Sequence, residues 1–151
     1  MSATSAASIS PNTSTGTTDA GGQGVRWIRL VMITNLGLVA LQAVSAGLLL
    51  SGNGRALTIH SDAAIALEPG ILVQAVSTIV LWRRGRLPGS MAGLSIALFA
   101  IVVLQAGLGY RRSFWLHVPI GVLIFGWLTH QVNSLNSLSR PRGTPAATRD
   151  S

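Results

Sequence analysis

The sequence predicts an all-α membrane protein that folds as a four-span antiparallel helical bundle. Of its 151 residues, 48% are hydrophobic and only 10% are charged, whereas a soluble domain carries about 25% charged residues. The few charges separate four long apolar runs, which is the pattern of charges that flank membrane spans. So few charged side chains could hardly cover a soluble domain of this size, which argues against a soluble enzyme.

Each of the four apolar runs is close to the ~20 residues that a helix needs to cross the hydrocarbon layer. Only the second run contains an acidic residue, Glu68. The polar segments 1–25 and 137–151 cannot bury enough apolar area to order themselves, so we expect two disordered cytoplasmic tails. Residues 26–136 then form the four-helix transmembrane domain. The predicted spans are residues 30–50, 63–82, 87–110 and 113–133.

The distribution of arginine predicts the orientation of the spans. Eight of the 11 basic residues lie in the N-terminal flank, the second loop and the C-terminal tail, and three lie in the first and third loops. By the positive-inside rule, both termini of this multi-pass protein are then cytoplasmic, with the chain in the cell membrane. The arginines form no basic stripe among polar residues, so no nucleic-acid partner is expected. The chain has no cysteine, which excludes cysteine-ligated iron–sulfur clusters and c-type haem.

An internal repeat links the first two spans to the last two. Leu-Gln-Ala occurs at 41–43 and again at 104–106. After each copy comes a glycine-containing helix end and then Arg-x4-His, at 55–60 and at 112–117. A hairpin repeated in the same orientation implies a pseudo-two-fold axis along the membrane normal. The bundle is therefore expected to consist of two repeated helical hairpins.

The repeat places one histidine, His60 or His117, near the outer end of span two and of span four. These spans are diagonal partners in an up-down bundle, so the two imidazoles can face each other at similar depth. Such a pair is suited to be the axial ligands of one haem b iron. The simpler alternative for each histidine is a residue that is solvated at the headgroup level, or hydrogen-bonded to glutamine or backbone inside the bundle.

Further polar residues would surround such a cofactor. Gln42 and Gln105 lie in the outer halves of spans one and three and flank the same volume. Haem propionates need cations or water, and three arginines lie at the same outer boundary. These are Arg55, Arg111 and Arg112.

Two segments of the second hairpin, 104–109 and 116–121, resemble the third and fourth helices of one half of a haem A synthase. Residues 41–60 are similar to the first and second helices of such a half. Enzymes of that family have eight spans in two four-helix halves, each with a histidine pair for haem. The resemblance covers about residues 30–130 and implies that His60 and His117 are haem ligands.

The sequence departs from the family in two respects. The chain is half as long, and it lacks the acidic residue and the arginine that accompany the first histidine in the family. Leu57 and Ser61 stand at those positions. The resemblance therefore implies a haem-binding fold more than haem A synthesis, and whether the chain is an enzyme stays open.

Glu68 and His130 are the other residues that could carry chemistry. Glu68 is either a proton-handling or partner-binding group, or it begins the helix together with Pro69, in which case 58–67 would be a re-entrant or interfacial segment. His130 lies too deep to reach the same iron as His117. We expect it at the cytoplasmic interface rather than as a ligand of a second haem.

Three functions are compatible with the sequence. The first is a membrane protein with one b-type haem for electron transfer or haem handling. The second is a cofactor-free accessory or assembly subunit that packs against a membrane-protein partner or a second copy of itself. The third is a small transporter or proton-conducting module that uses Glu68.

Overall fold

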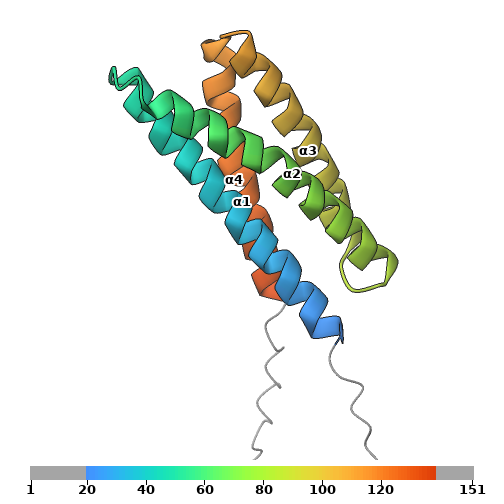
Figure 1. Cartoon of the computed structure of the whole chain (residues 1–151). Coiled ribbons are helices and arrows are strands. Elements are labelled where there is room, and N and C mark those ends of the chain that lie inside the picture. The colour runs from blue at the N-terminus through green and yellow to red at the C-terminus, as the bar shows by residue number, and fades with distance from the viewer. Residues whose placement is uncertain (1–19, 139–151) are drawn as a thin grey trace, which may run out of the picture.

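The computed structural model describes residues 20–138, which form four helices with no strand among them. The all-α prediction is therefore confirmed for this part of the chain (Figure 1). The helices are α1 (Ala20–Leu50), α2 (Ala56–Arg83), α3 (Gly89–Tyr110) and α4 (Phe114–Leu138).

The helices form an antiparallel bundle in which each helix packs against two others. Helix α1 contacts α2 and α4, and α3 also contacts α2 and α4. The α1–α2 and α3–α4 connections lie at one end of the bundle (Figure 1). The α2–α3 connection lies at the other end, together with the first residues of α1 and the last residues of α4. Helices α2 and α4 are thus diagonal partners, as the up-down topology predicted.

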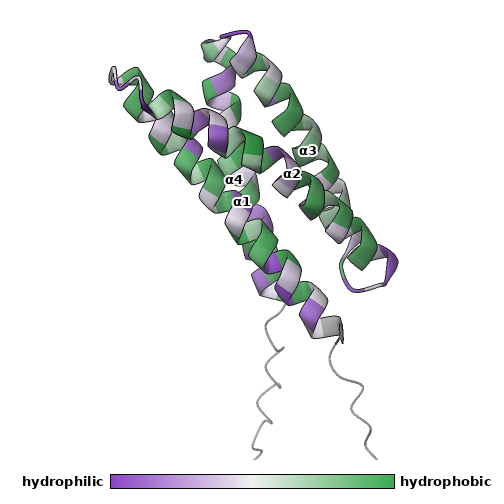
Figure 2. Cartoon of the chain, in the orientation of Figure 1, coloured by the Kyte–Doolittle hydropathy of each residue, from purple (hydrophilic) through white to green (hydrophobic). Residues whose placement is uncertain are grey.

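The bundle carries many apolar side chains on its surface, and its apolar core includes a few buried polar side chains. Leu30 and Val122 are 61% and 67% exposed, whereas Gln74 is fully buried. Figure 2 shows hydrophobic positions along the helices and a hydrophilic α2–α3 connection. Helices α1, α2 and α3 are long and apolar enough to cross a membrane. Large apolar side chains on the surface of helices of this kind indicate contact with a lipid bilayer.

Helix α4 is not among the three helices that meet this criterion. Its 25 residues are sufficient in length, but its second half alternates apolar residues with hydroxyl, amide and imidazole side chains. These are Thr129, His130, Gln131, Asn133, Ser134, Asn136 and Ser137.

The start of α1 differs from the prediction, because residues 20–25 are helical rather than part of a tail. Packing against α2 explains the longer helix. A Cβ atom at Gly24 would lie 3.0 Å from Leu81 Cδ2, so the glycine lets the two helices approach closely. Val25 then packs against the buried cluster that includes Ile28. The rest of the predicted tails, residues 1–19 and 139–151, lies outside the described residues.

The alternative in which a helix begins at Glu68 and Pro69 is wrong. Helix α2 begins at Ala56 and continues through Pro69, so residues 58–67 are helical and not re-entrant. A proline inside a helix removes one backbone hydrogen bond. In α2 the loss of this one hydrogen bond does not end the helix, because α2 packs against α1 on one side and α3 on the other.

The turns after α1 and α3 have the same helix-end geometry, which α2 also has at Gly85; the repeat of the two hairpins stays a prediction. Gly52 ends α1 with φ +88°, and Arg112 follows α3 with φ +55°. In each turn the next residue donates its N–H to the carbonyl five residues earlier, at 3.0 Å in both cases. This pattern is the Schellman motif, with a left-handed residue after the last helical turn.

Candidate functional site

A cavity of about 540 Å³ opens between the four helices in the half of the bundle next to the two hairpin turns. Its volume lies in the range of small-molecule and cofactor sites. Small side chains on all four helices leave the space, because each has little volume to fill it. They include Ala43, Gly47, Ala64, Ala106 and Gly121.

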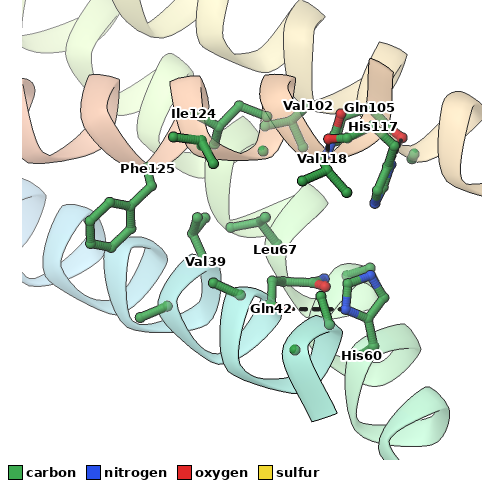
Figure 3. Close-up of a pocket in the computed structure, with 18 of the residues that line it drawn as sticks. Val39, Gln42, His60, Leu67, Val102, Gln105, His117, Val118, Ile124 and Phe125 are labelled. Atoms are coloured by element: carbon green, nitrogen blue, oxygen red, sulfur yellow. Dashed lines mark hydrogen bonds between the residues drawn. The ribbon is translucent and has the colours of Figure 1, made fainter. Parts of the chain in front are cut away.

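His60 on α2 and His117 on α4 face each other across this cavity (Figure 3). Their ring centres are 6.1 Å apart and the ring planes are inclined by 60°. Two imidazoles that bind one metal from opposite sides have their ligating nitrogens about 4 Å apart and their ring centres roughly 6 Å apart. The observed separation of the ring centres is close to that value.

Each histidine is held by the helix that precedes it in the hairpin. His60 Nδ1 lies 3.2 Å from the carbonyl oxygen of Gln42, and His117 Nδ1 lies 2.9 Å from that of Gln105. A carbonyl oxygen can only accept, so each Nδ1 carries the proton and donates it. Ser45 Oγ also lies 3.2 Å from His60 Nδ1 and can accept from the same N–H as the carbonyl of Gln42.

These hydrogen bonds determine which ring nitrogen is free. With Nδ1 protonated, a neutral imidazole has its lone pair on Nε2, the atom that can bind a metal. A carbonyl acceptor on the other ring nitrogen is the usual support of a metal-binding histidine, because it orients the ring and fixes the tautomer. His60 and His117 thus have the same support from equivalent residues of the two hairpins.

The side chains of Gln42 and Gln105 line the cavity as the sequence predicted. Gln105 Nε2 donates to the backbone carbonyl of His117 at 2.6 Å. The Oε1 atoms of both glutamines are buried and have no hydrogen-bond partner. Buried acceptors are normally satisfied, so these two atoms favour an occupant or a water molecule that donates hydrogen bonds within the cavity.

The three arginines of the predicted site are exposed and do not line the cavity. They lie in the hairpin turns or next to them. Arg55 directly precedes α2, and Arg111 and Arg112 follow α3. Their proposed contact with propionates stays a prediction.

Glu68 is partly buried and lines the same cavity as the two histidines. His130 is exposed at a lower level of α4 and lies 3.5 Å from Ser134 Oγ. Within residues 20–138, no group of three or more His, Asp or Glu side chains could hold a metal ion.

A buried polar layer below the cavity was not predicted. Asn35 Nδ2 donates to Gln74 Oε1 at 2.9 Å, and Gln74 Nε2 donates to Gln131 Oε1 at 2.6 Å. Ser95 Oγ donates to the same oxygen at 3.3 Å. One residue from each helix takes part, and all four are at most 1% exposed. The layer separates two apolar clusters of the core.

The spacing of two glutamines is a signal that could have revealed this layer. Gln74 follows His60 by 14 residues, and Gln131 follows His117 by 14 residues. The two glutamines are thus a further pair of equivalent positions, and they meet at the centre of the bundle.

In comparisons with known proteins, the chain matches no family model, no curated protein and no solved structure.

Proposed function

We propose that this protein is a four-span membrane protein that binds one haem b between α2 and α4, with both termini in the cytoplasm. The observation that carries the proposal is the matched pair of histidines. Each has its Nδ1 next to a backbone carbonyl and lines the cavity, with ring centres 6.1 Å apart. Electron transfer or haem handling is the function that such a site supports.

The chemistry of the donors favours haem over a bare metal ion. Two imidazoles fill two positions of a six-coordinate metal, and no group of three His, Asp or Glu side chains that could hold a metal ion occurs within residues 20–138. A tetrapyrrole supplies the other four ligands itself. Histidine is a common axial ligand of haem iron, and cofactor sites of this kind are built between facing helices of a bundle.

Two residues of the chain would bind the iron, and others would hold these two in place. His60 and His117 would bind the iron, which supplies one-electron redox chemistry when haem is present. The carbonyls of Gln42 and Gln105 would hold the rings in place. The arginines of the hairpin turns would meet the propionates. The resemblance of residues 41–60, 104–109 and 116–121 to one four-helix half of a haem A synthase agrees with this assignment.

Absorption spectroscopy of the detergent-purified protein tests this function directly. We expect a Soret band and the spectrum of a low-spin, six-coordinate haem. His60→Ala and His117→Ala should each abolish the low-spin spectrum, whereas His130→Ala, at the exposed histidine outside the cavity, should leave it unchanged. A wild-type protein that stays colourless after haem is supplied in excess would refute the proposal.

That negative result would favour an accessory or assembly subunit without a cofactor. The apolar surface of the bundle would then serve to pack against a partner or a second copy. Purification of a stable complex without a chromophore would be the expected observation for such a subunit.

A further inference from the structure

A second cavity, of about 350 Å³, lies between the first residues of α3 and the last residues of α4. We call it the α3–α4 cavity. Its lining combines hydroxyl and amide groups with apolar surface, unlike the largely apolar lining of the cavity between the two histidines. The lining residues that matter here are Ser90, Met91, Leu94, Gln131, Ser134 and Ser137.

Gln131, which lines the α3–α4 cavity, has an unpaired hydrogen-bond donor. Its Oε1 accepts from Gln74 Nε2 and from Ser95 Oγ. Its Nε2 is buried and has no hydrogen-bond partner among residues 20–138. An amide Nε2 can only donate, and buried donors are normally paired. This atom therefore favours an occupant of the cavity that has an oxygen acceptor.

The α3–α4 cavity lies at the level where a membrane meets water. Ser90 belongs to the first turn of α3, directly after the α2–α3 connection. Trp82 near the end of α2 and Trp27 near the start of α1 are 47% and 57% exposed, and exposed tryptophan is enriched at membrane–water interfaces. A cavity at this level is next to the headgroups and glycerol esters of the lipids.

The charges at this end of the bundle favour an anionic occupant. Arg83 is the last residue of α2 and Arg84 follows it, and both side chains are exposed. Between Glu68 and Asp150 the chain has no acidic residue, so neither α3, α4 nor the connection before α3 carries a negative side chain. Basic residues next to a membrane span attract anionic lipids.

We propose that the α3–α4 cavity binds the headgroup and glycerol ester region of an anionic phospholipid. An ester or phosphate oxygen accepts from Gln131 Nε2 and from the serine hydroxyls. Arg83 and Arg84 compensate the charge of the phosphate, and Met91 and Leu94 contact the first part of an acyl chain. The two cavities share no lining residue, so this proposal does not depend on haem.

Thermal unfolding of the full-length protein in detergent tests the proposal, with dioleoylphosphatidylglycerol or dioleoylphosphatidylcholine added in mixed micelles. A ligand that binds only the folded protein raises its unfolding temperature. The anionic lipid should bind about tenfold more tightly than the zwitterionic one, because each basic residue near the headgroups contributes to the attraction. The double variant Arg83→Gln/Arg84→Gln should lose this preference.

Ser134→Phe and Asn133→Phe are a matched pair of variants on α4. Ser134 is half-buried and lines the α3–α4 cavity, whereas Asn133 is exposed and outside its lining. A phenylalanine at position 134 occupies the space of the lipid, so the preferential binding of the anionic lipid should be lost. It should be retained in Asn133→Phe. Ser90→Phe, at the exposed start of α3, fills the same cavity and serves as a second test if Ser134→Phe does not fold.

Several results would overturn the proposal. The wild type would bind both lipids equally, or Ser134→Phe would bind the anionic lipid as tightly as Asn133→Phe does. Glycerol phosphate that binds as tightly as the lipid would indicate a soluble phosphate ligand instead. A dimer without bound lipid in native mass spectrometry would show that a second copy covers the cavity. A protein that binds the lipid but lacks a Soret band would refute only the haem proposal.

Discussion

Replacing Gly109 with alanine should weaken haem binding about tenfold to a hundredfold, by displacing the ring of His117. A Cβ atom at Gly109 would lie 3.0 Å from His117 Cε1 and 3.3 Å from Nδ1, whereas ordinary contacts are 3.4–4 Å. The ring must therefore shift by some tenths of an ångström. Metal–ligand distances tolerate only about 0.2 Å, and the bond from His117 Nδ1 to Gln105 would be strained as well.

The magnitude follows from the role of that support. Changes to groups that orient a metal-binding histidine typically reduce affinity 10–100-fold. This corresponds to about 1.4–2.8 kcal/mol of binding free energy. The assay is titration of the apoprotein in detergent with haem, followed by the growth of the Soret band.

Gly107→Ala provides a matched control two residues away on the same helix. A Cβ atom at Gly107 would have no neighbour within 4 Å, so only the helix propensity changes. Both substitutions should stabilise the helix by up to about 1 kcal/mol. Unfolding of the variants would therefore not explain weaker haem binding. Equal dissociation constants for the two variants would refute the reasoning that the Gly109 contact positions His117.

Three other predictions concern stability and topology. Gln74→Leu should destabilise the bundle by about 1–3 kcal/mol, because the amides of Asn35 and Gln131 lose a buried partner; an unchanged thermal unfolding temperature would contradict this. Arg112→Gly should stabilise the protein by about 1 kcal/mol, since a side chain in the left-handed region is strained, and Gly52→Ala should have the opposite effect in the same unfolding assay. Reporter fusions at both ends of the chain should read as cytoplasmic, and an external reading at either end would reverse the proposed orientation.

The sequence by itself determined the helices and the pairing of the histidines. Long apolar runs with few charges predict membrane helices because an uncharged helix of that length satisfies its own backbone in lipid. Short connections make consecutive helices antiparallel and place spans two and four on the diagonal. From that topology alone, His60 and His117 could be expected to face each other, and their ring centres lie 6.1 Å apart.

Only the tertiary structure decided which polar atoms meet and where the helices begin. Hydropathy along the chain carries no information on the partner of a side chain, so the layer around Gln74 and Gln131 stayed hidden despite the equal spacing from the histidines. The additional residues at the start of α1 pack against α2, where Gly24 lies close to Leu81. The tautomer of each histidine was likewise decided by a carbonyl on another helix. The position of that carbonyl depends on the distance between the helices, which packing fixes and local sequence does not.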